Sequence, residues 1–245
     1  MKKRAGSLFL CLLMAASAAL AEPLALTEDL SGEIREQLNE KAAYIYSYRY
    51  PRAAEGSAAA EQVNSFFRYR AEDAAGFEVP MNADYYRGTE PEADIRVEVD
   101  YRVTCNDGEY FSVLTETRQE GLSSWSGYTF SMKGLKPGLS VALPYLLGLL
   151  EGEETDTWLQ DRQTARADAT VREMVWAELQ ARNGKDLELA EDLEREALDY
   201  AFFPEEDFYL EENGDPVFFL QPGTAEASGR LITVTLPVED ILDEM

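Results

Sequence analysis

Residues 94–105 read DIRVEVDYRVTC, and their alternation of apolar and polar side chains decides the fold class. Every second residue from Ile95 to Cys105 is apolar or aromatic, and the residues between them are polar or charged. A period of two indicates a strand with one buried and one wet face, as is common in antiparallel sheets. The pattern places Cys105 on the buried face, where we expect an inert thiol.

The residues that follow predict further strands. Asn106-Asp107-Gly108 is a tight-turn signal, and strand-like segments come after it at 109–118 and at about 125–133. Residues 94–133 therefore predict a meander of three antiparallel strands.

Upstream, residues 43–50 (AYIYSYRY) also alternate, with four tyrosines on one face, and predict a strand that ends at Pro51. A half-buried face is favoured for these tyrosines over a binding platform. Ser57 is a predicted helix cap, and the helix either fades near Gly76 or resumes through Tyr85. Residues 28–42 form a polar lead-in that is weakly helical at best.

The C-terminal half has a different order of elements. A capping box at Thr157 starts a helix that reaches Arg182, and a second helix is predicted over 186–202. Strands follow at 208–210, 217–220 and 230–236. A short apolar core segment at 141–150 and a turn at 136–138 precede the first helix.

The predicted fold class is α+β, with helices packed on antiparallel sheets in two subdomains. The N-terminal subdomain spans 22–134 and contains a strand, a helix and the meander. The C-terminal subdomain spans 135–245 and contains two helices and three strands.

Residues 1–21 have the pattern of a secretory signal peptide. A basic start at Lys2–Arg4 precedes an apolar run at 8–20, and the small residues Ala19 and Ala21 predict cleavage after Ala21. The apolar run is shorter than the roughly 20 residues that span a bilayer. We therefore expect a secreted or extracytoplasmic protein whose mature form has no membrane span.

The net charge and the amino-acid composition exclude several classes of function. The chain has 22 basic and 47 acidic residues, and the leader holds three of the basic ones, so the mature net charge is 19 − 47 = −28. The negative electrostatic field of such a charge repels nucleic acid and attracts cationic partners. The chain has no histidine, which excludes Ser-His and Cys-His nucleophiles and the usual zinc sites. We expect no cofactor and no metal.

The densest acidic cluster lies at 205–215 and overlaps the stretch FYLEENGDPVFF at 208–219. A calcium loop needs a specific order of carboxylates that this stretch lacks. The Asn213-Gly214 pair instead predicts a hairpin turn with both residues at positive φ. A carboxylate-based hydrolase needs two converging acids, and no pair can be selected from so many by sequence.

Several segments together resemble the paired extracytoplasmic domains of the RsiV-like and PdaC-like family, found in lysozyme-sensing anti-sigma factors and peptidoglycan deacetylases. They are YIYSYRYP, AAAEQVNSFFRY, YRVTCNDGEYFSVLTET, FSMKGLKPGLSVAL, FYLEENGDPVFFLQPG and ITVTLPVEDI, within residues 40–242. The sequence departs from the family pattern at 121–124 and in a shorter loop at 223–229.

The resemblance implies a stand-alone, non-enzymatic binding module that recognises a basic protein such as lysozyme, or peptidoglycan. The alternatives are a carboxylate-based hydrolase acting on envelope glycan and a structural envelope protein. The oligomeric state stays open. The residues implied in binding lie in and beside the loop 221–229, and they are Gln221, Pro222, Gly223 and Glu226.

Overall fold

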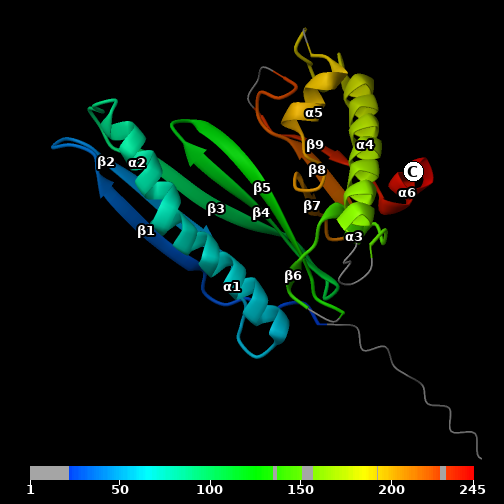
Figure 1. The fold of residues 1–245 in the computed structure, drawn as a ribbon, viewed down its shortest axis with the longest axis horizontal. Coiled ribbons are helices and arrows are strands. Elements are labelled where there is room, and N and C mark those ends of the chain that lie inside the picture. The colour runs from blue at the N-terminus through cyan, green and yellow to red at the C-terminus, as the bar shows by residue number, and fades with distance from the viewer. Residues whose placement is uncertain (1–21, 135–136, 151–156, 192, 227–229) are drawn as a thin grey trace, which may run out of the picture.

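The computed structural model describes residues 22–134, 137–150, 157–191, 193–226 and 230–245. The predicted signal peptide at 1–21 lies outside these residues. The described chain is α+β, as the sequence predicts, with a six-stranded and a three-stranded sheet (Figure 1).

The six-stranded sheet has the order β1-β2-β3-β4-β5-β6. All neighbouring pairs are antiparallel except β2 and β3, which are parallel, so the sheet is mixed. The predicted three-stranded meander is present as β3 to β5. The strands are β1 (Leu30–Gln37), β2 (Ala43–Tyr50), β3 (Ile95–Asn106), β4 (Tyr110–Gln119), β5 (Leu122–Ser131) and β6 (Leu139–Ser140).

A long helical segment connects β2 to β3. It consists of α1 (Ala58–Asp73), a π-helical turn (Ala74–Glu78) and α2 (Val79–Arg87), so the helix continues past Gly76. A crossover of this kind is what a parallel strand pair requires. The segment lies along one face of the sheet (Figure 1).

The tyrosine row of β2 faces this helical segment. Tyr44, Tyr46 and Tyr50 are buried, and Tyr50 stacks on Phe67 with ring centroids 5.5 Å apart. The row is therefore core rather than a binding platform, and it is more deeply buried than predicted because α1 and α2 cover it.

The expectation for residues 28–42 is wrong. They contain β1, an eight-residue strand that pairs with the whole of β2. Its alternating side chains are half-buried and exposed, with none fully buried. This strand is held in place by its hydrogen-bonded ladder with β2 and not by apolar side chains. Its sequence therefore lacks the apolar alternation that would predict a strand.

The expected placement of Cys105 on the face shared with Ile95 is also wrong. The ladder between β3 and β4 shifts register between Val103 and Cys105, so Cys105 pairs with Ser112. A bulge of this kind moves the following side chain to the opposite face. Cys105 is buried in the C-terminal core, and burial is the main cause that raises its thiol pKa to about 11.

The C-terminal part packs a long helix on the small antiparallel sheet (Figure 1). Helix α4 spans Thr157–Arg182, as predicted, and Val171, Val175 and Leu179 are fully buried in its contact surface. The other elements are α3 (Leu143–Leu146), β7 (Phe208–Leu210), β8 (Pro216–Leu220), β9 (Ile232–Thr235) and α6 (Val238–Glu244).

The predicted second helix over 186–202 is wrong. Among the described residues of this segment, the helical elements are a 3₁₀ turn (Arg195–Ala197) and the single-turn α5 (Leu198–Ala201). Leu187, Leu198 and Phe202 enter the core separately, and the Ala190 amide donates to the Ala225 carbonyl at 3.0 Å. This bond ties the segment to the loop after β8, in place of the intrahelical bonds of a continuous helix.

The stretch 208–219 forms the β7–β8 hairpin, as predicted, but with a different turn. Gly214 has φ of 85°, whereas Asn213 is not at positive φ. The Gly214 amide donates to the Glu211 carbonyl, and the Glu211 amide donates to the Asp215 carbonyl. This is a type I turn followed by a left-handed glycine, which is the common three-residue hairpin connection.

Candidate functional site

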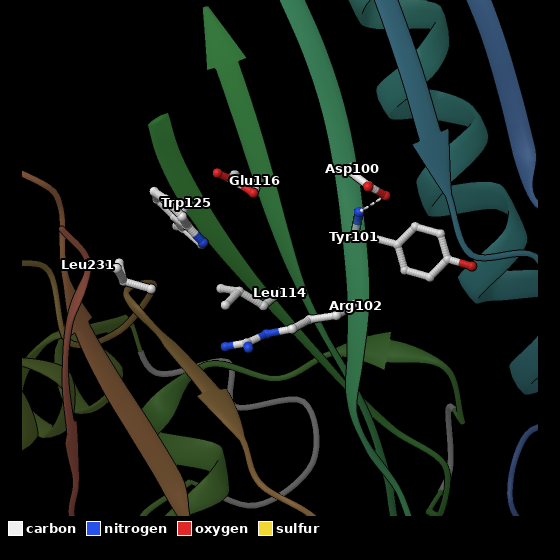
Figure 2. Close-up of a pocket in the computed structure, with 7 residues that line it drawn as sticks. All are labelled: Asp100, Tyr101, Arg102, Leu114, Glu116, Trp125 and Leu231. Carbon is white, nitrogen blue, oxygen red and sulfur yellow. Dashed lines mark hydrogen bonds between the residues drawn. The ribbon is translucent and has the colours of Figure 1, made fainter. Parts of the chain in front are cut away.

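The face of the large sheet opposite α1 carries a cavity of about 300 Å³ where the two sheets meet (Figure 2). Cross-strand register puts its side chains on one face, because Arg102 lies opposite Leu114, Asp100 opposite Glu116, and Glu116 opposite Trp125. We call this cavity the inter-sheet groove. It is lined by Asp100, Tyr101, Arg102, Leu114, Glu116, Trp125 and Leu231.

The floor of the inter-sheet groove is apolar. Leu114 belongs to a small hydrophobic cluster with Tyr209 and Phe219, and Trp125 and Leu231 pack against its edge. Figure 2 shows the side chains of Leu114, Trp125 and Leu231 gathered at the groove, while the ring of Tyr101 points to the other side of its strand.

Charged side chains line the rest of the groove. The Arg102 guanidinium lies over the Tyr209 ring, 5.4 Å from its centroid, and Glu116 accepts a 2.8 Å hydrogen bond from Ser123 Oγ. Burial alone would raise the pKa of Asp100, but hydrogen bonds from Arg49 and from the Tyr101 amide hold it below its usual value. Asp100 is therefore a carboxylate at neutral pH and does not serve as a general acid.

An aromatic ring beside carboxylates suits a cationic group of a ligand. Guanidinium and ammonium groups are attracted to the face of a tryptophan and form charge-assisted hydrogen bonds with carboxylates. The inter-sheet groove therefore has the chemistry to hold a lysine or arginine side chain.

Of the four residues predicted to bind, Gln221 contacts a residue of this groove, and both Gln221 and Glu226 have internal roles. Gln221 accepts a hydrogen bond from the Trp125 amide (2.9 Å) and donates one to the Trp125 carbonyl (2.7 Å). Glu226 is only 3% exposed and pairs with Arg230 at 2.8 Å. Pro222 is half-buried and Gly223 is exposed, and residues 227–229 of the loop lie outside the described residues.

We expect replacement of Gln221 by alanine to lower the free energy of unfolding by about 1 kcal/mol, because the Trp125 backbone loses both partners. Urea unfolding of Gln221→Ala checks this value, with Pro222→Ala as the neighbouring control. Equal stability of the two variants would show that Gln221 does not hold β5 against the loop.

Sequence reasoning missed Trp125, Leu114 and Leu231 as site residues. It placed Asp100 and Arg102 on the wet face of their strand, which is correct. No sequence signal relates Trp125 of β5 to Leu231, which lies just before β9, because the two meet only through tertiary packing.

A second, larger cavity of about 600 Å³ lies on the helical side of β5. Its lining includes Tyr69 and Arg70 of α1, Tyr128 of β5 and the acids Glu205 and Asp207. Burial raises the pKa of Asp207 to about 6, and this carboxylate accepts a 2.8 Å hydrogen bond from the Phe203 amide. Asp207 therefore holds the turn that precedes β7.

Asp168 of α4 lies near this region, and its carboxyl pKa is raised further than that of Asp207. It is 6% exposed, and burial together with Glu205 raises its pKa to about 8. Arg172 approaches it at 3.8 Å, and among the described residues its Oδ1 atom has no hydrogen-bond partner. Asp168 is not part of the cavity lining.

The described residues contain no group of three or more side chains able to hold a metal ion. In the part of the chain that the structure covers, no helix combines the length and apolar character needed to cross a bilayer.

Comparison with solved structures shows the fold. A member of the DUF3298 family from Bacteroides fragilis superposes with a TM-score of 0.53 at 12% identity, covering 89% of this chain and 92% of that one. A DUF3298 family protein from Pseudomonas aeruginosa gives 0.50 at 12% identity, covering 91% and 94%. No family model matches the sequence. No curated protein matches it either. This chain is therefore similar in fold to DUF3298 proteins, and the likeness extends over most of its length.

Proposed function

We propose that this chain is an extracytoplasmic, non-enzymatic binding module that recognises a cationic protein of the lysozyme type. The observation that carries the proposal is the excess of acidic residues, 47 against 19 basic ones in residues 22–245. The sequence resemblance to RsiV-like and PdaC-like domains and the DUF3298-like fold support it. Peptidoglycan is the alternative ligand.

The acidic excess favours a basic partner for a physical reason. A field of one sign concentrates ligands of the opposite sign and speeds their encounter. Specific binding also needs a contact point that positions the partner. The inter-sheet groove offers one, because Trp125 and Glu116 stand side by side on neighbouring strands.

We expect binding to a basic protein to weaken strongly as salt rises from 50 to 300 mM, because exposed charges are screened within about 10 Å at 0.1 M. Titration calorimetry with lysozyme measures the affinity, and pull-down on purified peptidoglycan tests the alternative ligand. Affinity for neutral glycan that salt does not change would contradict the electrostatic proposal.

Matched variants locate the contact. Glu116→Gln in the groove and Glu55→Gln at an exposed turn change the net charge equally. If the groove receives a cationic side chain, Glu116→Gln and Trp125→Ala each weaken binding about tenfold, whereas Glu55→Gln has little effect. Equal effects of the two glutamate variants would place the contact elsewhere.

A carboxylate-based hydrolase is the second candidate, and one observation favours it. Glu205 lines the larger cavity and interacts with Asp168, whose pKa is raised to about 8. Two carboxyl groups that share a proton can do acid–base chemistry. However, Asp168 is buried outside the cavity lining, so binding remains the function that the geometry supports best.

A further inference from the structure

Strand β1 forms an open edge of the six-stranded sheet (Figure 1). In its ladder with β2, the Leu38 amide at the end of the strand donates to the Ala42 carbonyl at 3.0 Å. Because backbone groups alternate in direction along a strand, the even-numbered residues of β1 face β2. Ser31, Glu33, Arg35 and Gln37 therefore direct their amides and carbonyls outward.

The other edges of the described sheets are short or engaged. Strand β6 has two residues. At β7 the Leu210 amide donates to Ser112 Oγ at 3.0 Å, and at β9 the Thr233 carbonyl accepts from Arg182 at 2.8 Å. At β1, Arg87 Nε donates to the Gln37 carbonyl at 3.1 Å, which engages one end of the edge only.

The sequence of β1 (LSGEIREQ) is complementary to itself in one antiparallel register. When Ile34 lies opposite Ile34 of a second copy, each Glu33 lies opposite an Arg35. In this register the outward-facing residues 31, 33, 35 and 37 pair with one another, as hydrogen bonding requires. Shifting by two residues in either direction places Glu33 opposite Glu33 or Arg35 opposite Arg35, which is destabilising.

Side chains on the two faces of β1 fit the same register. Glu33 and Arg35 are exposed on the open face of the sheet, and Arg35 makes a long ion pair with Asp94 at 3.9 Å. On the helical face, Ile34 is half-buried against the N-terminal core. The Tyr48 ring lies across Gly32, so it would meet Glu36 of a second copy.

We propose that two copies of this chain associate through β1, edge to edge and antiparallel, to form one continuous twelve-stranded sheet. The proposal rests on the open edge and on its charge complementarity, and it does not depend on the proposed ligand. Electrostatic repulsion between two acidic copies of the chain opposes dimerisation. The dimer is therefore tested at 0.15 M salt, where the screening length is about 8 Å.

The test is sedimentation velocity of the protein expressed from its full sequence and purified in the form that the host produces. We expect a concentration-dependent monomer–dimer equilibrium. Glu33→Arg and Arg35→Glu each create two like-charged pairs and weaken the dimer about tenfold. The double variant E33R/R35E restores opposite pairs and recovers the original affinity. Glu40→Arg, at an exposed site beyond the strand, controls for net charge.

Arg35→Pro removes an outward amide without touching the β1–β2 ladder, so it abolishes the dimer while the monomer stays folded by circular dichroism. Hydrogen exchange gives an independent readout, because the Glu33 and Arg35 amides become protected only at concentrations where the dimer forms. A monomer throughout, up to about 1 mM, overturns the proposal. A dimer that persists in the Arg35→Pro variant also overturns it. Protection of the β1 amides from hydrogen exchange only when a different protein is added does so as well.

Discussion

Replacing Gly127 with alanine should cost about 3 kcal/mol of unfolding free energy, although the change adds one methyl group. A Cβ at Gly127 would overlap the Phe208 carbonyl oxygen and lie 2.7 Å from its carbonyl carbon. Gly127 is where β5 of the large sheet meets β7 of the small one, so the obstacle is backbone and cannot rotate away.

The expected result is a large drop in the urea midpoint and loss of the contacts between the sheets. The matched control is Gly76→Ala, because a Cβ there meets nothing within 4 Å and the residue is in a helical turn. Its stability should be unchanged or slightly higher. Similar losses for both variants would show that close approach at Gly127 does not hold the sheets together.

Replacing Asp168 with asparagine should stabilise the protein at pH 7.5 by on the order of 2 kcal/mol. One pKa unit corresponds to about 1.4 kcal/mol, so a rise from 3.8 to about 8 sets an upper limit of about 6 kcal/mol. The gain is smaller than this limit because Arg172 loses an ion-pair partner in the variant. The pKa of Asp168 is about 8 in the folded protein and near 3.8 when exposed. Burial is the main cause, and Glu205 adds to it, whereas Arg172 opposes it. Asparagine has no charge to bury.

The sign of the pH dependence follows from linkage. A carboxyl whose pKa is raised on folding contributes fully to stability below pH 3.8, and this contribution is lost as the pH rises through about 8. The gain from Asp168→Asn should therefore grow between pH 4 and 8 and then level off. Chemical denaturation across this range measures it, with the exposed Asp161→Asn on the same helix as control. A gain that does not change with pH would contradict the assignment.

The same variant tests the second candidate function. A hydrolase that used the pair of Asp168 and Glu205 would lose glycan-releasing activity in Asp168→Asn while becoming more stable. Unchanged binding of a basic protein by this variant is expected if the inter-sheet groove is the contact site.

Local pattern predicted much of this fold. Alternation over 94–105, the turn at 106–108 and the hairpin at 208–219 specified strands and their order, because side-chain period and turn residues act over a few positions. The capping box at Thr157 and the predicted end at Arg182 located α4 for the same reason. The period of two also placed the four tyrosines on one face, for which a half-buried face is favoured over a binding platform.

The candidate site could not be predicted in the same way. Sequence pointed to Gln221 and Glu226, whose polar groups prove to be bonded within the molecule. Trp125 gave no signal because its partners are distant in sequence: Leu114 is in β4, and Leu231 lies just before β9. The predicted helix at 186–202 is wrong because its apolar residues have helical spacing but enter the core separately, as Leu187 and Leu198 do.

The sequence by itself determined the α+β class, the acidic charge and the order of most strands and helices, since these depend on composition and on contacts between near neighbours. Only the tertiary structure decided that β1 is a strand, that Cys105 faces the C-terminal core, and that Trp125 stands at a groove. Each of these depends on a ladder, a bulge or a contact between the two sheets, whose energy comes from residues distant in the chain.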